Sequence, residues 1–273
     1  MRFRLTLSTS SVRGITIPLN YQYPLSAWIY KTIHSGDHAF AGFLHEKGFE
    51  TGGKSFKLFT FSMLDIPHGK FTIQGDRLHI TASEISLDIS FLVPQAMQHF
   101  ISGLFNNQRF RLGDHNSQAD FLVSHVEMLA PPSFTEKMKF KTLSPLLVSH
   151  HIEGVRTAAY LRPGHHEYER LFFDNLTAKF AAALQAGLHV NKLDADVPPE
   201  TMQLKLTSDP KTKGILIKAN TPQQTKIIGY LFEFEITAPP LLIYTGYYAG
   251  FGEKNSLGLG CCAPLSPQHH TST

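Results

Sequence analysis

The order in which strand-like and helix-like patterns follow one another constrains the fold of this chain most. Residues 2–8 alternate polar and apolar side chains, which is the period of a half-buried strand. A helical apolar stripe follows over residues 25–33, behind Pro24. A second, short helix is predicted from a cap at Asp37 to a stop at Gly48. The chain therefore opens as a strand followed by helices.

A group of strands and a further helix come next. Alternating patterns predict a meander of strands over residues 57–62, 70–73, 78–82 and 85–92. The intervening Pro-His-Gly and Gln-Gly-Asp sequences are typical of turns. A helix is predicted over 94–105, and strands over 109–112 and 121–128. Strand, helix, strands, helix, strand is the ferredoxin-like order, in which two helices pack on one face of an antiparallel sheet.

The same order repeats after the proline-rich segment 130–133. The predicted elements are a strand over 139–149, a helix over 166–188, strands over 203–207, 215–219 and 227–236, a short helix over 240–247 and a final strand. We therefore predict an α+β fold of two tandem ferredoxin-like (RRM-like) domains. The N-terminal domain would span residues 1–130, the linker 131–138 and the C-terminal domain 139–273.

Bulk composition limits the partners of this chain. Lys plus Arg exceed Asp plus Glu by only 25 to 22, so any contact with nucleic acid must be local. The first 14 residues do not have the apolar core of a secretory signal, and no apolar run is long enough to cross a membrane. We expect a cytoplasmic protein with no membrane partner.

Cysteine and histidine give little support to a metal or a disulfide. The two cysteines, Cys261 and Cys262, are adjacent, which excludes a disulfide framework and a Cys-x-x-Cys zinc site. We interpret them as strand residues. Two histidine pairs, at 150–151 and 165–166, could suggest a metal, but adjacent side chains point in different directions and no third ligand is apparent. We expect no metal and no cofactor.

A glycine-rich segment near the C-terminus has the composition of an anion-binding loop. Residues 250–260 read Gly-Phe-Gly-Glu-Lys-Asn-Ser-Leu-Gly-Leu-Gly. Glycines let the backbone approach a ligand, and Lys, Asn and Ser can bind phosphate oxygens. The residues predicted to bind are Gly250, Gly252, Lys254, Asn255, Ser256, Gly258 and Gly260. The alternative is a turn needed only for tight strand packing.

Neither common mononucleotide motif fits this segment. A G-x-G-x-x-G fingerprint would require glycine where Asn255 stands, and a P-loop would require Gly-Lys-Ser/Thr at its end. Both motifs also follow an early strand, whereas this segment comes close to the end of the chain. The arrangement favours a polymeric phosphate backbone as the ligand.

Two ferredoxin-like patterns combined with this late loop resemble the RAMP superfamily of CRISPR-associated proteins. More narrowly, the chain resembles the sixth Cas family, the endoribonucleases that cut CRISPR precursor RNA within its repeats. The supporting stretches are Ile29-Tyr30, Phe43-Leu44-His45-Glu46, Lys57-Leu58-Phe59-Thr60-Phe61-Ser62 and Thr142-Leu143-Ser144-Pro145. The resemblance spans nearly the whole chain and ends before the tail 267–273.

The resemblance implies a metal-independent reaction in which the RNA 2'-hydroxyl attacks the adjacent phosphorus. The 5'-oxygen then leaves, and the products carry a 2',3'-cyclic phosphate and a 5'-hydroxyl. It also implies that a tyrosine, a histidine and a lysine carry the reaction, which by position are Tyr30, His45 and Lys57. The implied partner is CRISPR repeat RNA, as precursor and as processed guide. An effector complex and a homodimer stay open as further partners.

These residue types suit the chemistry, and each also has a structural alternative. Imidazole can serve either proton-transfer role near neutral pH, and the helix dipole at His45 slightly favours the general acid. Lys57 can offset charge on the phosphate, and Tyr30 can orient a reacting group by a hydrogen bond. His45 could instead be a solvated helix end, Tyr30 a core aromatic and Lys57 a flank of a sheet edge.

Competing residues and a competing function also stay open. Lys54 competes with Lys57 as the catalytic lysine, and His34 and His38 compete with His45. The alternative function is a non-catalytic RAMP protein that binds CRISPR RNA as a subunit of an effector complex. Both functions need the glycine-rich loop, but only the nuclease needs His45 and its partners beside the scissile phosphate.

Overall fold

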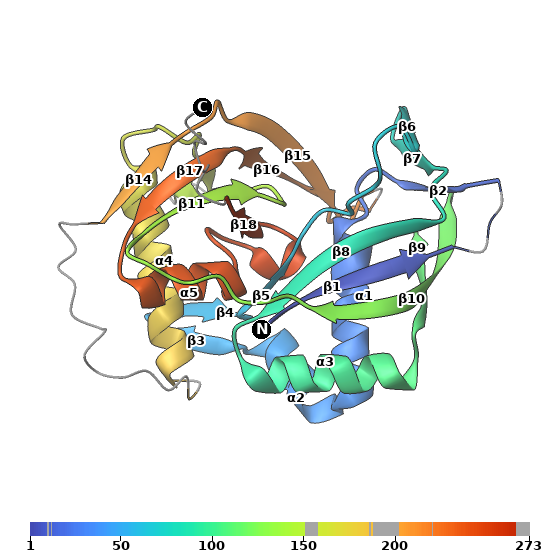
Figure 1. The fold of residues 1–273 in the computed structure, drawn as a ribbon, viewed down its shortest axis with the longest axis horizontal. Coiled ribbons are helices and arrows are strands. Elements are labelled where there is room, and N and C mark those ends of the chain that lie inside the picture. Colours follow the sequence, from blue (N-terminus) through green and yellow to red (C-terminus); the bar gives the residue numbers. More distant parts are fainter. Residues whose placement is uncertain are drawn as a thin grey trace, which may run out of the picture.

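The computed structural model describes residues 1–9, 11, 13–150, 158–185, 187, 202–219 and 221–265 (Figure 1). Three predicted features lie wholly or partly outside these ranges: His151, the end of the helix predicted over 166–188, and the tail 267–273.

The first half of the chain is built on a five-stranded sheet with the order β5-β8-β1-β10-β9. Its strands are β1 (Arg2–Ser8), β5 (Phe59–Phe61), β8 (Glu84–Phe91), β9 (Arg109–Gly113) and β10 (Gln118–Met128), and neighbours pair antiparallel. The alternation in β1 buries Phe3, Leu5 and Leu7 together in the core. Four of the strands, β5-β8-β1-β10, have the ferredoxin-like order.

Three helices accompany this sheet. They are α1 (Gln22–Gly36), α2 (His38–Glu46) and α3 (Pro94–Asn106). Helices α1 and α3 pack closely on each other (Figure 1), because Gly103 has no Cβ to meet the Thr32 carbonyl. The predicted cap is present: the Asp37 carboxylate accepts a hydrogen bond from the Phe40 amide at 2.7 Å. Its position fixes where α2 begins.

The predicted meander is wrong. Strands β6 (Phe71–Gln74) and β7 (Arg77–Ile80) form a hairpin that pairs with β2 (Ile15–Pro18) in a separate three-stranded sheet. The reason lies in burial, since β2 and β7 pair their isoleucine and leucine side chains and bury them. Alternation within a strand identifies the strand, but it does not specify the strand's partner.

The second half repeats the arrangement on a four-stranded sheet with the order β14-β17-β11-β18. Its elements are β11 (Lys137–Thr142), α4 (Tyr168–Gln185), β14 (Gln203–Leu206), β17 (Glu233–Thr237), α5 (Pro240–Ala249) and β18 (Cys262–Pro264). Cys262 lies in β18 and Cys261 immediately before it. The prediction of two tandem ferredoxin-like folds is confirmed. The boundaries at residues 131–138 stay a prediction.

Two predicted strands of the second half are each divided in the structure. Residues 139–149 contribute to β11 and to β12 (Ser149–His150), which pairs with β13 (Ala159–Tyr160). Residues 227–236 contribute to β16 (Thr225–Leu231) and to β17, and β16 pairs with β15 (Lys211–Ile217) in a hairpin outside the main sheet. The break falls at Phe232, whose amide donates a hydrogen bond to the Thr142 hydroxyl at 2.9 Å.

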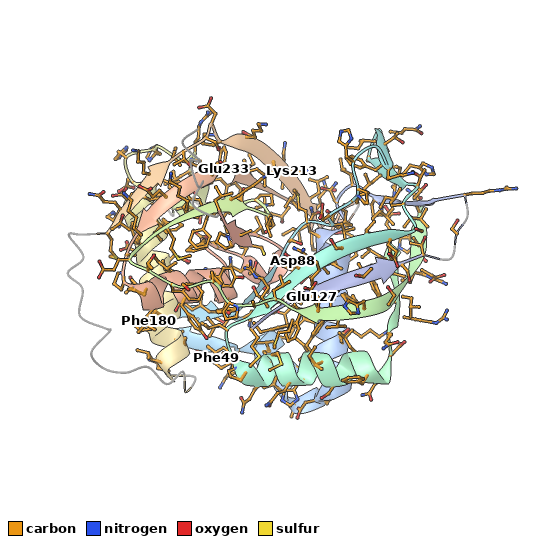
Figure 2. All side chains as sticks on the ribbon, in the orientation of Figure 1. Phe49, Asp88, Glu127, Phe180, Lys213 and Glu233 are labelled. Carbon is orange, nitrogen blue, oxygen red and sulfur yellow. The ribbon has the colours of Figure 1, made fainter. Side chains whose placement is uncertain are left out.

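The two halves share a packed and hydrogen-bonded boundary. Side chains fill the space between the sheets (Figure 2), and the second hydrophobic core includes Phe56, Leu58, Leu92 and Val93 from the first half. The buried Arg2 guanidinium donates to the carbonyl oxygens of Cys262 and Tyr247, at 2.7 and 2.6 Å. Among the described residues, no helix combines the length and apolarity needed to cross a membrane.

Candidate functional site

The structure brings together Tyr30, His45 and Lys57. Tyr30 comes from α1 and His45 from the last turn of α2, and their rings meet edge to face with centroids 5.6 Å apart. Lys57 follows β4 (Lys54–Phe56), and its Nζ donates a hydrogen bond to the His45 carbonyl oxygen at 3.1 Å. Three residues far apart in the chain therefore form one cluster.

The local backbone around Lys57 explains its placement. Gly48, two residues after the end of α2, has a φ of +67°, and a Cβ at this position would lie 2.5 Å from the Phe56 carbonyl oxygen and 2.9 Å from Lys57 Cδ. Glycine therefore lets the chain after α2 approach the backbone that directly precedes Lys57. Leu58, directly after the lysine, has a φ of +54° although it is not glycine, and its side chain is buried in the core. Packing of Leu58 in the core stabilises this backbone turn, and the turn sets the direction of the Lys57 side chain.

Burial sets the protonation of two members of the cluster. It raises the pKa of Tyr30 to about 12, against the opposing effect of a hydrogen bond with the Ser256 side chain. Tyr30 is therefore a neutral phenol at physiological pH and can donate a hydrogen bond. Burial also lowers the pKa of Lys57, against the opposing charge of Glu50. The imidazole of His45 is exposed and open to a ligand.

The predicted loop residues divide into two groups. Lys254 is exposed, Ser256 is half-buried, and both line a pocket described below. Asn255, in the short 3-10 helix η3 (Asn255–Leu257), is buried, and its Nδ2 donates to the carbonyl oxygens of Phe251 and Leu259, at 3.0 Å each. The Asn255 amide thus forms hydrogen bonds within the loop, whereas Lys254 and Ser256 are open to a ligand.

The four loop glycines are buried and shape the backbone. Gly258 and Gly260 have φ values of +79° and +71°, and a Cβ at either would meet the Phe61 ring or the Phe251 carbonyl oxygen. Gly250 and Gly252 direct their carbonyl oxygens at the Nζ of Lys179, which donates to both. The loop packs on β5 and α1 of the first half, where the Ser26 hydroxyl donates to the Ser256 carbonyl at 2.6 Å. The glycine-rich segment therefore joins the two halves.

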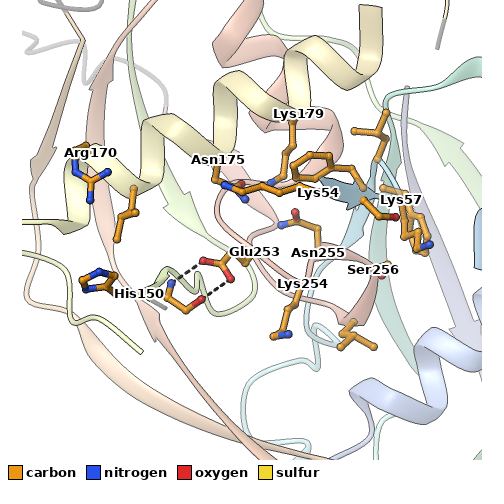
Figure 3. A pocket seen from close by; sticks show the side chains of 17 residues that line it. Lys54, Lys57, His150, Arg170, Asn175, Lys179, Glu253, Lys254, Asn255 and Ser256 are labelled. Atoms are coloured by element: carbon orange, nitrogen blue, oxygen red, sulfur yellow. Dashed lines mark hydrogen bonds between the residues drawn. The ribbon is translucent and has the colours of Figure 1, made fainter. Parts of the chain in front are cut away.

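A pocket of about 700 Å³ lies where the β3–β4 hairpin, α4 and the glycine-rich loop meet (Figure 3). The hairpin is formed by β3 (Phe49–Thr51) and β4. Five basic side chains line the pocket: Lys54, Lys57, Arg170, Lys179 and Lys254, of which Lys179 is buried and bonded to loop carbonyl oxygens. The carboxylate among its lining residues, Glu253, is held by the amide and hydroxyl of Ser149 at 2.7 Å each. The pocket is therefore suited to an anionic ligand.

The competing histidines lie apart from this pocket. His34 and His38 contact each other with ring centroids 4.3 Å apart. Neither these two nor His45 lines the pocket, but the backbone carbonyl of His45 is hydrogen-bonded to Lys57, which does line it. Lys54, the competing lysine, lines the pocket together with Lys57, but only Lys57 has a hydrogen bond to His45.

Sequence reasoning missed the contribution of α4. Arg170, Asn175 and Lys179 line the pocket from this helix, and Lys179 is 2% exposed. The signal was present, because Asn175 and Lys179 interrupt the apolar face that includes Phe172 and Leu176. A polar residue at a buried position of an amphipathic helix needs a partner, and that need indicates a site.

Of the two histidine pairs, the structure describes His150, His165 and His166, and neither these nor the cysteines are grouped as metal ligands. His150 Nδ1 lies 3.0 Å from a carboxylate oxygen of Glu167, and the rings of His165 and His166 contact each other. Burial raises the pKa of the Cys261 thiol to about 11. Across the described residues, no cluster of three or more His, Cys, Asp or Glu side chains is arranged to hold a metal ion.

Comparisons with known proteins match the whole length of the fold. Residues 16–127 match the family model "CRISPR-associated protein Cas6, N-terminal", and residues 129–264 match "CRISPR associated protein Cas6, C-terminal". The chain is 30% identical over 263 residues to CRISPR-associated endoribonuclease Cas6 1 of Methanocaldococcus jannaschii, covering 95% of this chain and 91% of the relative. It is 28% identical over 261 residues to CRISPR-associated endoribonuclease Cas6 of Pyrococcus furiosus, covering 95% and 88%.

Solved structures give the same result for the fold. One described as CRISPR associated protein Cas6 has a TM-score of 0.71 and 26% identity, covering 97% of this chain and 99% of that one. Another, from a Cas6-related gene of Pyrococcus furiosus, has a TM-score of 0.77 at 23% identity, covering 98% and 99%.

Proposed function

Because the chain belongs to the Cas6 family of CRISPR-associated proteins, we propose that it is an endoribonuclease that cuts CRISPR precursor RNA within its repeats. The observation that carries the proposal is the cluster of Tyr30, His45 and Lys57, whose lysine lines a pocket with four further basic side chains. The two relatives above are both named CRISPR-associated endoribonucleases. The product would be a guide RNA.

The substrate's phosphate backbone fits the charge of the pocket. Lys254 and Ser256 of the glycine-rich loop face it from one side, and Lys54 and Lys57 from another. Cationic groups that surround a phosphodiester supply most of the affinity, whereas base contacts supply sequence selectivity. The backbone of the repeat would therefore cross the pocket between the two halves of the chain.

The reaction takes one proton from the 2'-hydroxyl and delivers one to the 5'-oxygen; His45 can serve one of these transfers, and solvent water serves the other. The 2'-oxygen forms a bond to phosphorus as it loses its proton, the bond from phosphorus to the 5'-oxygen breaks, and that oxygen gains a proton. His45, exposed in the last turn of α2, can deliver a proton to the leaving 5'-oxygen. The same imidazole, when neutral, could take the proton of the 2'-hydroxyl.

Tyr30 and Lys57 would bind the scissile phosphate and stabilise its charge. The neutral phenol of Tyr30 can donate a hydrogen bond to a non-bridging oxygen or orient the 2'-hydroxyl, because its raised pKa keeps the proton on the ring oxygen. The Lys57 ammonium can offset the charge that develops on the non-bridging oxygens in the transition state. Its hydrogen bond to the His45 carbonyl keeps it beside the proposed proton donor.

Chemical substitution of the RNA tests this proposal. The purified protein is incubated in EDTA with repeat RNA, and in parallel with the same RNA carrying a 2'-deoxy sugar immediately upstream of the cut. We expect one cut in EDTA, a 2',3'-cyclic phosphate end, and no cut of the deoxy substrate. A deoxy sugar placed one nucleotide further upstream should leave cleavage intact. Cleavage that requires a divalent metal, or that survives the first deoxy substitution, would exclude the mechanism.

A further inference from the structure

Helix α4 contributes to the pocket lining a polar side chain with one oxygen that has no hydrogen-bond partner in the described part of the chain. Asn175 lies one turn after Leu171 and one turn before Lys179, and all three line the pocket (Figure 3). Asn175 is only 7% exposed, and its Oδ1 is buried without a hydrogen-bond partner among the described residues.

An unpartnered amide in this position requires an explanation. Buried polar side chains nearly always have a hydrogen bond, because losing contact with water otherwise destabilises the fold. Four other described side-chain atoms are also buried without a partner: Arg2 Nε, Thr9 Oγ1, Gln22 Oε1 and Tyr168 OH. None of those four residues lines the pocket. Asn175 therefore combines an unmet hydrogen-bonding capacity with a place in the lining of a site. Because its Oδ1 is enclosed, the side chain must turn for both amide atoms to meet a ligand.

The rest of the pocket indicates what the amide meets. Apolar side chains of Phe56, Leu58, Leu171 and Leu257 line it beside the cationic residues. Its volume of about 700 Å³ lies within the usual range of 300–1,000 Å³ for sites that enclose a small ligand. Two amides line the pocket, and that of Asn255 is bonded within the loop. Apolar walls, the Asn175 amide and surrounding positive charge together match a nucleotide, whose base is flat and apolar on its faces and polar at its edge.

A carboxamide is a suitable group for recognising a base edge. It offers a hydrogen-bond donor and an acceptor side by side, which can pair with the adjacent acceptor and donor of a nucleobase. Such contacts require an unpaired base, as is usual in sequence-specific recognition of RNA. Because Lys57 also lines this pocket, the bound nucleotide would lie close to the phosphate that is cut.

We propose that Asn175 is a specificity-determining residue that binds the edge of one unpaired base of the substrate RNA, adjacent to the cleavage site. This inference rests on the proposed function, since it places the base beside the phosphate that His45 and Lys57 act on. The apolar walls hold the base, and Lys54 and Lys254 hold the flanking phosphates.

The test compares wild-type protein with Asn175→Leu and Asn175→Asp on repeat RNA randomised, one position at a time, around the cut. Sequencing of single-turnover products gives the base preference at each position. We expect wild type to prefer one base at one position by about 10-fold or more, since a bidentate side-chain contact discriminates by that factor. Asn175→Leu should lose that preference, and Asn175→Asp should favour a base with more donors. Asn116→Leu, at an exposed turn, serves as the control.

The outcomes separate this inference from the proposed function. If wild type cuts and the variants keep its preference at every position, the inference is wrong and the nuclease proposal stands. If wild type does not cut, the nuclease proposal fails, and the RNA retained on each protein is sequenced instead. In that case, a base preference in the RNA retained on wild type that is absent from the RNA retained on Asn175→Leu would support the inference. Equal base preferences in the two RNA pools would overturn it.

Folding provides an independent readout. Asn175→Leu should melt at or above the wild-type temperature, because an apolar side chain replaces an unpartnered buried amide. A clear fall in melting temperature would show that the amide is bonded within the fold, and would overturn the inference.

Discussion

Lys57 and Lys54 line the same pocket from two positions of one hairpin, but they have different surroundings. Lys57 donates to the His45 carbonyl, and burial lowers its pKa. Lys54 is exposed at the start of β4. We therefore predict that Lys57→Met slows single-turnover cleavage by about 100-fold, as expected for loss of a charge-stabilising donor. Lys54→Met should mainly weaken RNA binding, measured by filter retention. A larger rate loss in Lys54→Met than in Lys57→Met would reverse the assignment.

Individual residues also mark the limit of what could be predicted from the sequence. Lysine, asparagine and serine in a glycine-rich segment indicated anion binding, and Lys254 and Ser256 do line the pocket. Composition could not distinguish Asn255, whose amide is bonded within the loop, from Asn175, whose Oδ1 has no hydrogen-bond partner among the described residues. The difference depends on which way each side chain points, and this follows from tertiary packing.

At the scale of elements, the glycine-rich loop owes its shape to backbone that other residues cannot adopt. Gly260 has a φ of +71°, and an added Cβ would meet the Phe251 carbonyl oxygen, whereas Gly52 has a φ of +53° with open space around it. We predict that Gly52→Ala costs about 1 kcal/mol, the penalty of the left-handed conformation alone. Gly260→Ala should cost about 3 kcal/mol or more and slow cleavage, because the loop must move.

Urea denaturation of the two alanine variants measures this difference in unfolding free energy. Gly52→Ala is the matched control, because it measures the cost of alanine at a positive φ without a steric clash. Equal losses of unfolding free energy in the two variants would show that the loop can relax around a Cβ at position 260.

Most helices and strands were predictable, because the spacing of apolar residues along an element is a local property of the sequence. The pairing of the strands was not predictable in this way. The strand at 2–8 and the helix at 94–105 match β1 and α3 closely. The hairpin β6–β7 was assigned to the wrong sheet, because its partner β2 is a four-residue strand more than 50 residues earlier in the chain. Likewise, the break between β16 and β17 depends on Thr142, a distant side chain.

At the scale of the whole molecule, side chains of the first half bond to backbone of the second. Arg2 donates to the carbonyls of Tyr247 and Cys262, Ser90 to that of Tyr248, and Thr60 to that of Leu259. The Ser90 and Thr60 bonds are 3.0 and 2.9 Å long. These contacts fix the two halves relative to each other, so the pocket between them has a defined shape. No pattern in the sequence links such distant residues.

Stability of the whole chain should depend on pH through Lys179. Burial lowers the pKa of this lysine to about 7, against the opposing charge of Glu253, whereas an unfolded lysine titrates near 10.5. Between these values the unfolded state binds the extra proton, so stability rises with pH. We predict that the unfolding free energy of wild type minus that of Lys179→Met increases by about 1.4 kcal/mol per pH unit from pH 7 to 10.

Urea denaturation at several pH values measures this slope. Because the other titrating groups are common to both proteins, the difference isolates Lys179. A difference that does not change over this range would show that Lys179 keeps its proton in the folded protein.

The most direct test of the whole account is the single-turnover cleavage rate of His45→Ala beside His34→Ala, on cognate repeat RNA. The His45 ring contacts Tyr30, and the backbone carbonyl of His45, which His45→Ala keeps, accepts the hydrogen bond from Lys57; the His34 ring instead contacts His38. We predict that His45→Ala retains RNA binding but cuts at least about 100-fold more slowly, the usual loss when a proton-transfer group is removed. His34→Ala should cut at close to the wild-type rate. Wild-type cleavage by His45→Ala would contradict the assignment of the active site.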